Sequence, residues 1–247
     1  MKRRYLAFDL ETVKLAPAGA CDWRLYRPLW ISCAGTFANG QSKPQVWHGG
    51  RSSKRPANRM NRSEVCKLVR YLERQVDDGY TIVTWNGLGF DFDVLAEESG
   101  MVEVCKRLAR DHVDMMFHVL CQRGFGISLG SVAKGMGLKG KAEGMSGAEA
   151  PRLWVEGKRE RVLQYVAQDV RTTLALAEIC ESERLLCWVT RSGRRRLMAL
   201  PRGWFPVRAA QKLPEPNTFW MTSQWSREKF IAWLQRPIVP LAEQLRT

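Results

Sequence analysis

The chain has 247 residues, carries a formal net charge of +14 at pH 7 and is 45% hydrophobic. That hydrophobic fraction excludes a disordered chain, and no apolar run reaches the roughly 20 residues that a membrane span needs. Seven cysteines, none within four residues of another, exclude a closely spaced zinc motif and disfavour a disulfide framework. We therefore expect a soluble, cytoplasmic protein with a polyanionic partner and no membrane association.

The first part of the chain predicts an α/β domain with a mixed sheet. Short apolar or β-branched runs predict strands at 4–10, 30–37, 45–48 and 81–85. Apolar side chains at helical spacing predict a helix from Ser63, as its N-cap, to Val76. Further helices are expected at 90–98, twice within 101–123, near 128–136 and over 158–183. Three strands, a helix, a strand and then several helices are typical of a mixed sheet covered by helices.

The last 66 residues differ from the rest in composition. Residues 182–247 contain twelve Lys and Arg against four Asp and Glu, together with five of the ten tryptophans. A hairpin is expected over 187–200 and a short helix over 227–234. We therefore divide the chain into a domain at 1–185 and a basic, tryptophan-rich extension at 186–247, which packs on the domain or contacts its substrate.

Two acidic residues interrupt the first expected strand. Asp9 and Glu11 are two positions apart, so both side chains point to one side of the strand while Phe8 and Leu10 point to the other. Two carboxylates on a buried face repel each other and lose hydration unless a cation holds them. An exposed strand end is the alternative for an isolated pair.

Two further acids occupy comparable positions. Asp91 follows the strand 81–85 and a glycine-containing turn, at the start of a helix where the helix dipole stabilises negative charge. Tyr165 and Asp169 are four residues apart in the last long helix, which places the phenol and the carboxylate on one apolar face. Each motif alone is also explained by a helix cap or an exposed acid.

Together the motifs resemble a known family. Asp-x-Glu in the first strand, Asn86-x-x-x-Phe90-Asp91 after a later strand and Tyr165-x-x-x-Asp169 in a late helix are similar to the three motifs of the DEDD superfamily of 3′–5′ exonucleases. The tyrosine matches the tyrosine-type branch, which includes the proofreading domains of family B DNA polymerases. The resemblance covers about residues 4–185 and implies a ribonuclease H-like fold with a mixed five-stranded sheet.

The resemblance also implies a chemistry. Asp9, Glu11, Asp91 and Asp169 would bind two divalent cations, and hard oxygen ligands suit Mg²⁺ or Mn²⁺. Tyr165 would orient the attacking water, and the product would be nucleoside 5′-monophosphates released from a free 3′ end of DNA or RNA, preferentially single-stranded. Asp93 is the alternative to Asp91 as a ligand, and Asp114 resembles an accessory aspartate or is a helix cap.

Basic side chains are expected to hold the nucleic acid strand. The candidates, with Asn86 in the turn after the fourth strand, are Arg51, Lys54, Arg55, Arg194, Arg195 and Arg196. Two other functions stay open at this point. One is a catalytically inactive nucleic-acid-binding module of the same fold, and the other is a ribonuclease H-type endonuclease.

Overall fold

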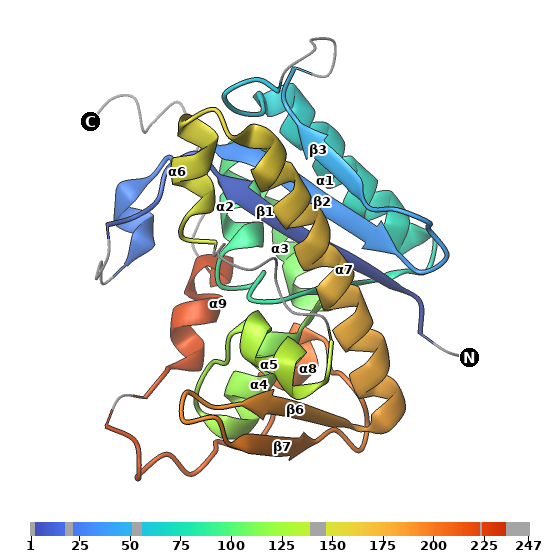
Figure 1. Ribbon diagram of the computed structural model, residues 1–247, viewed down its shortest axis with the longest axis vertical. Coiled ribbons are helices and arrows are strands. Elements are labelled where there is room, and N and C mark those ends of the chain that lie inside the picture. The colour runs from blue at the N-terminus through green and yellow to red at the C-terminus, as the bar shows by residue number, and fades with distance from the viewer. Residues whose placement is uncertain (1–2, 18–21, 51–55, 139–146, 223, 236–247) are drawn as a thin grey trace.

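The computed structural model describes residues 3–17, 22–50, 56–138, 147–222 and 224–235. A mixed sheet of five strands in the order β3-β2-β1-β4-β5 forms its centre (Figure 1). Its strands are β1 (Tyr5–Thr12), β2 (Ile31–Ala38), β3 (Gln45–His48), β4 (Thr81–Thr84) and β5 (Val113–Asp114). β1 pairs antiparallel with β2 and parallel with β4. The expected α/β class and mixed five-stranded sheet are confirmed.

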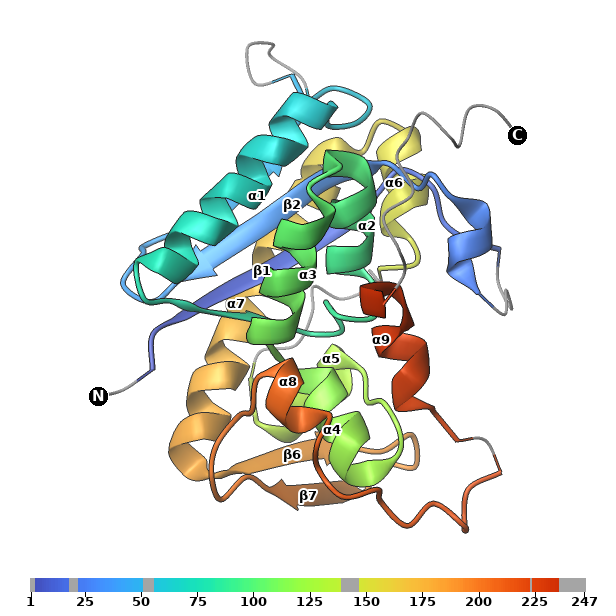
Figure 2. The ribbon, with the colours of Figure 1, turned by 180° about the vertical axis from the view of Figure 1, so that it is seen from behind.

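Helices cover both faces of the sheet. The helices of the domain are α1 (Arg62–Asp77), α2 (Asp91–Ser99), α3 (Val102–Asp111), α4 (Met115–Arg123), α5 (Leu129–Gly135), α6 (Ala150–Val155) and α7 (Arg159–Glu183), with a short 3-10 helix at Trp23–Tyr26. Figure 1 shows α7 running across the face that is turned to the viewer, in contact with β1 and β2. From behind, α1, α2 and α3 cover the opposite face (Figure 2).

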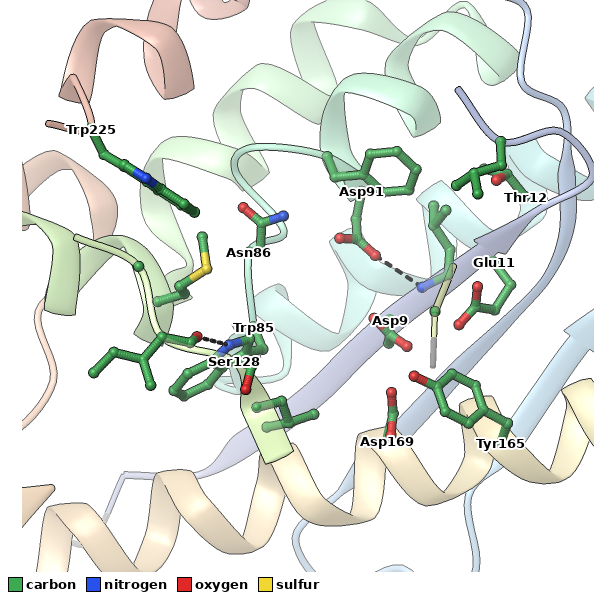
Figure 3. Close-up of a pocket in the computed structure, with 18 residues that line it drawn as sticks. Asp9, Glu11, Thr12, Trp85, Asn86, Asp91, Ser128, Tyr165, Asp169 and Trp225 are labelled. Carbon is green, nitrogen blue, oxygen red and sulfur yellow. Dashed lines mark hydrogen bonds between the residues drawn. The ribbon is translucent and has the colours of Figure 1, made fainter. Parts of the chain in front are cut away.

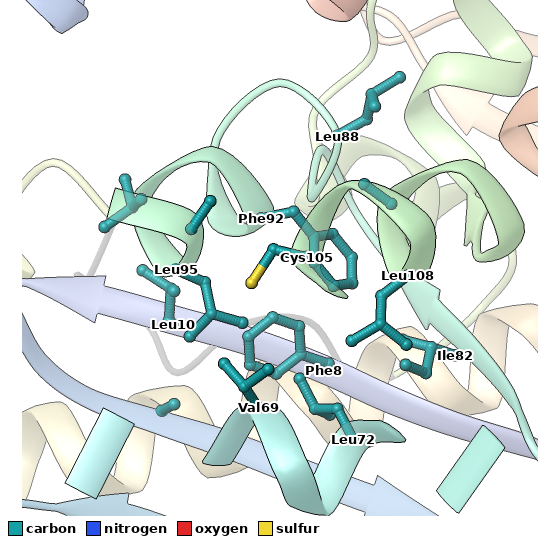
Figure 4. Packing of buried hydrophobic residues seen from close by; sticks show 14 of the residues in the cluster. Phe8, Leu10, Val69, Leu72, Ile82, Leu88, Phe92, Leu95, Cys105 and Leu108 are labelled. Atoms are coloured by element: carbon teal, nitrogen blue, oxygen red, sulfur yellow. The ribbon is translucent and has the colours of Figure 1, made fainter. Parts of the chain in front are cut away.

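Side-chain alternation along β1 divides the core into two layers. Leu6, Phe8 and Leu10 are buried in one cluster with residues of α1, α2 and α3. Figure 4 shows Phe8 and Leu10 in this cluster. Tyr5 and Ala7 point the other way and pack with residues of α7. The period-two prediction for this strand is therefore confirmed, and Asp9 and Glu11 belong to the face that α7 covers.

One helix boundary differs from the prediction. α1 has Asn61, not Ser63, as its N-cap: the Asn61 side chain accepts a hydrogen bond from the Glu64 backbone N–H, and Glu64 bonds back to the Asn61 backbone N–H. This reciprocal arrangement satisfies two backbone donors that the first helical turn leaves without partners. Ser63 lies inside the helix.

The C-terminal residues pack against the domain. They form the hairpin β6 (Leu185–Val189) and β7 (Arg195–Ala199) and the helices α8 (Val207–Ala210) and α9 (Arg227–Gln235). Trp204 is fully buried and its indole N–H donates to the carbonyl of Ala177 in α7, while the Trp233 indole donates to the carbonyl of Leu88. In the described ranges, no helix has the length and apolar character to cross a membrane.

Candidate active site

A cavity of about 450 Å³ opens where β1, the turn after β4, the start of α2 and the middle of α7 meet (Figure 3). Its lining brings together side chains that are up to 216 positions apart in sequence, from Asp9 to Trp225. The predicted site residues among them are Asp9, Glu11, Asn86, Asp91, Tyr165 and Asp169.

A close contact between α7 and β2 brings the helix to the carboxylates of β1. Gly35 in β2 lies opposite Asp9 in the strand register. A Cβ atom at Gly35 would lie 3.0 Å from the carbonyl oxygen of Val166 and 3.2 Å from a methyl carbon of Val170. Glycine at this position allows the approach without displacing either neighbour, and the approach brings Tyr165 and Asp169 over Asp9 and Glu11 (Figure 3).

Gly35→Val is therefore expected to push α7 away from the sheet. We expect a loss of about 1–3 kcal/mol in the free energy of unfolding, the usual cost of overpacking a close contact. Any activity of the cavity residues is expected to fall by a larger factor than stability alone explains, because both α7 residues of the cavity move with the helix. Urea unfolding and activity measurements on the folded variant check this. Gly130→Val is the control, since a Cβ at Gly130 meets no atom within 4 Å; equal effects of the two variants would contradict the prediction.

Asp91 occupies the first turn of α2 and is nearly fully buried. Its Oδ1 accepts a hydrogen bond of 2.9 Å from the backbone N–H of Leu10, which ties the helix start to β1 between the two acids of that strand. Burial raises the pKa of Asp91 to about 7, with the charge of Asp114 adding to the rise and the Leu10 hydrogen bond opposing it. A cation in the cavity would favour the ionised carboxylate.

Asp93 has a structural role instead. Its carboxylate pairs with Arg24 at 2.7 Å and Arg27 at 2.6 Å, and Arg27 also pairs with Glu97. These contacts bind the 3-10 helix segment to α2. Asp93 does not line the cavity, so of the two candidates in this turn the geometry places Asp91 at the site.

Asp114 shapes the turn that carries Asn86. One carboxylate oxygen of Asp114 accepts from the backbone N–H groups of Asn86 at 3.1 Å and Phe117 at 2.9 Å, and the other accepts from Leu88 at 2.9 Å. Asn86 has φ of +75°, a left-handed conformation that needs such support. Asp114 is thus both the N-cap of α4 and the anchor of the turn, and it does not itself line the cavity.

Tyr165 faces three acids. Burial raises the pKa of Tyr165 far above its ordinary value, and the charges of Asp169 and Glu11, a hydrogen bond with Asp169 and the charge of Asp9 raise it further. The phenol therefore keeps its proton at neutral pH and acts as a hydrogen-bond donor.

Sequence reasoning missed several residues of the lining. Trp225 of the C-terminal segment is about half exposed and lies against Gly126, where a Cβ atom would come within 2.5 Å of its ring. Trp85, which packs against the core from one side, also lines the cavity, and its indole N–H donates to the carbonyl of Ile127 at 2.9 Å. No local motif marks either tryptophan, since each reaches the cavity through contacts that are distant in sequence.

A model of the RNase H superfamily matches residues 47–180, more than half of the chain. The chain belongs to the RNase H superfamily. The matched range contains Asp91, Tyr165 and Asp169, whereas Asp9 and Glu11 precede it. A search of curated protein sequences found no match.

Among solved structures, this RNase H superfamily chain is similar to the family B DNA polymerase from the hyperthermophilic archaeon Pyrobaculum calidifontis, at 21% sequence identity and a TM-score of 0.52. The similarity covers 73% of this chain and 25% of the polymerase chain. At this identity the comparison shows a shared fold. The expected likeness to family B polymerases is confirmed at that level.

The predicted strand-binding residues divide into two groups. Arg51, Lys54 and Arg55 lie outside the described residues. Arg194, Arg195 and Arg196 are exposed on the β6–β7 hairpin and none of them lines the acidic cavity. Arg195 donates to the carbonyl of Gly135 at 2.9 Å, which ties the hairpin to α5.

The donor set of the cavity fits divalent cations in this RNase H superfamily chain. All charged side chains among the described lining residues are carboxylates, with no Lys or Arg between them. In the described ranges, no three acidic, histidine or cysteine side chains are gathered tightly enough to make a ready-formed metal centre.

Two buried histidines, His112 and His118, are expected to make the folded protein less stable in acid. His112 bonds to the Thr84 hydroxyl and the Ala109 carbonyl, and burial lowers its pKa to about 3; burial lowers that of His118 to about 4. Unfolded histidine takes up its proton near pH 6.5, so each contributes stability that is complete above pH 6.5 and falls as the pH drops toward 4.

Below pH 6.5, His112 lowers the free energy of unfolding by at most about 1.4 kcal/mol for each unit by which the pH falls. His112→Gln is expected to reduce the loss of unfolding free energy between pH 6.5 and pH 4.5, relative to the wild type, in urea titrations. Asp91 and Asp114 titrate in both proteins with the opposite sign, so the difference between the two proteins isolates the histidine. Parallel curves for the two proteins would contradict this assignment.

Proposed function

We propose that this protein is a metal-dependent 3′–5′ exonuclease that releases nucleoside 5′-monophosphates from single-stranded DNA or RNA. One observation carries the proposal: four carboxylates and a tyrosine from β1, α2 and α7 surround one cavity whose described lining has no basic side chain. Nuclease chemistry agrees with membership of the RNase H superfamily. The 3′–5′ direction rests on Tyr165, four residues before Asp169, as in tyrosine-type exonucleases.

The four carboxylates would hold two divalent cations, Mg²⁺ or Mn²⁺. When bound, such ions lower the pKa of water and neutralise charge on the scissile phosphate and on the leaving 3′ oxygen. Asp9 and Glu11 point from the strand toward α7, and Asp169 points back from the helix, so the phosphate would enter between the sheet and α7 (Figure 3).

The remaining residues orient the reactants. Tyr165, protonated at neutral pH, would donate a hydrogen bond to the attacking water and cannot serve as its base. Asn86, held by Asp114, would contact the terminal nucleotide from the opposite side of the cavity. The exposed ring of Trp225 lies at the cavity and offers a surface for stacking of a base.

Degradation of matched substrates tests the proposal. A 5′-labelled single strand incubated with Mg²⁺ or Mn²⁺ is expected to shorten stepwise from its 3′ end, with nucleoside 5′-monophosphates as products and no reaction in EDTA. A circular single strand is the matched control and should stay intact. Internal cuts in the circle would replace the proposal with an endonuclease, and tight binding without cleavage of either substrate would replace it with an inactive binding module.

A further inference from the structure

A second cavity, of about 640 Å³, lies between the end of α4, the β6–β7 hairpin and residues 216–220 of the C-terminal segment. The first cavity, which we call the acidic cavity, is lined by the carboxylates of Asp9, Glu11, Asp91 and Asp169. The second cavity is basic instead. The described lining contains two arginines, three aromatic side chains and no acid. These five residues are Arg123, Arg196, Phe125, Trp188 and Trp220.

We propose that this basic aromatic cavity binds single-stranded nucleic acid upstream of the 3′ nucleotide that is cleaved. The inference rests on the proposed exonuclease function and adds a binding site that the C-terminal extension helps to build.

The aromatic side chains are arranged for stacking. The Phe125 ring lies edge-on to both Trp188 and Trp220, with centroids 6.3 Å apart in each pair. Trp188 is buried, whereas 70% of Trp220 is exposed. The Trp220 indole N–H donates to the carbonyl of Asn217 at 3.1 Å, so the ring is held in place while its surface stays open. An ordered, exposed indole can accept a nucleobase of any sequence.

The two arginines supply the charge that a phosphate backbone requires. Arg196 lies directly opposite Trp188 in the hairpin register, and both line the cavity. Arg123 donates to the carbonyl of Leu197 at 3.2 Å, which anchors its exposed side chain at the rim. Neither arginine forms an ion pair with another described residue. Positive charge beside an open aromatic surface is the combination that binds single strands without sequence preference.

A short segment of chain separates this cavity from the acidic one. Phe125 lines the basic cavity, and Gly126, Ile127, Ser128 and Leu129 line the acidic cavity. The C-terminal segment follows the same border, with Trp220 in the basic cavity and Trp225 in the acidic one. Aromatic side chains therefore flank both sides of this border, Trp225 on the acidic side and Phe125 and Trp220 on the side of the two arginines, so a strand whose 3′ end lies among the carboxylates could extend across it.

Binding can be measured separately from cleavage in the full-length Asp169→Asn protein. The probes are 5′-fluorescent single-stranded oligonucleotides of increasing length, titrated in Mg²⁺ at fixed salt. Trp220→Ala is expected to raise the Kd for long oligonucleotides roughly 5- to 100-fold, as for one lost base stack, and to leave the Kd for the shortest ones unchanged. Arg196→Glu should produce the same length dependence.

Two neighbouring side chains provide matched controls. Phe219 is 96% exposed and does not line the cavity, so Phe219→Ala removes an aromatic ring next to Trp220 in sequence and is expected to leave the Kd unchanged. Arg202→Glu is the matched control for Arg196→Glu and should also leave the Kd unchanged, because Arg202 is exposed and does not line the cavity. Unchanged melting temperatures would confirm that all four variants fold.

Equal effects of Trp220→Ala and Phe219→Ala, or a loss of affinity that does not depend on length, would overturn the inference. Tighter binding of an acidic peptide than of any oligonucleotide, lost in Trp220→Ala, would also overturn it. If the wild type fails to degrade strands but the length-dependent shift is observed, the exonuclease proposal fails and the binding site stands.

Discussion

Asp169→Asn is expected to abolish strand degradation while nucleic acid binding is retained. Asp169 lies on the buried face of α7, directed at the carboxylates of β1 (Figure 3). The substitution keeps the shape of the side chain and removes its charge, so we expect the proposed cation binding to weaken and the protein to stay folded. Removing a single electrostatic group from an active site costs roughly 100- to 1000-fold in rate, and we expect at least that loss.

The measurement compares initial rates on a 5′-labelled single strand with Kd values for the same strand. Asp9→Ala is expected to give the same result from the opposite side of the cavity. Asp77→Asn removes an identical charge from the exposed end of α1 and should leave the rate unchanged. An Asp169→Asn protein that degrades strands at the wild-type rate would remove Asp169 from the proposed site and the catalytic assignment with it.

Local periodicity made most of this site predictable. The two-residue repeat of β1 separated Asp9 and Glu11 from Phe8 and Leu10, and the structure places those pairs on opposite faces of the sheet. The four-residue spacing of Tyr165 and Asp169 set both on the inner face of α7. Such spacings are fixed by backbone geometry, so they can be deduced without knowledge of the tertiary structure.

Features that depend on contacts between distant segments were not predictable. β5 has two residues and exists only because Val113 pairs with Val83 of β4. The need for glycine at position 35 arises from a helix about 130 positions later in the chain. Trp225 reaches the acidic cavity from a segment whose residues 215, 216, 218 and 224–226 lie beside the end of α4. The spacing from Asn86 favours Asp91 over Asp93 as a site residue, but the ion pairs of Asp93 with the arginines at 24 and 27 could not be deduced from the local sequence.

The hydrogen bonds of Asp114 are also contacts between distant segments. Asp114→Ala is expected to cost more than about 3 kcal/mol in the free energy of unfolding. The carboxylate is 1% exposed and accepts hydrogen bonds from three backbone N–H groups. Alanine leaves those three donors buried without an acceptor, and each such group costs about 1–3 kcal/mol. A loss of this size is a large part of the stability of an ordinary domain.

Asp114→Asn separates the effect on the turn from the effect on the fold. Burial raises the pKa of Asp114 to about 6, so a neutral side chain of the same shape is tolerated better than alanine. Asparagine retains one acceptor oxygen for Asn86 and Phe117 but presents an amide toward the Leu88 N–H. We expect an intermediate loss of stability and a reduced rate from the displaced Asn86 turn, with Mg²⁺ dependence unchanged because Asp114 does not line the cavity.

Urea unfolding and strand degradation at saturating Mg²⁺ measure both effects. Asp111→Ala is the control, since Asp111 is a partly exposed acid three residues away that pairs with Arg208 on the surface, and exposed pairs contribute about 0–1 kcal/mol. If Asp114→Ala is no less stable than Asp111→Ala, the three hydrogen bonds do not hold the turn. If instead Asp114→Asn needs much more Mg²⁺ for the same rate, Asp114 acts on the cations directly, and the turn that it anchors is not its principal contribution to the site.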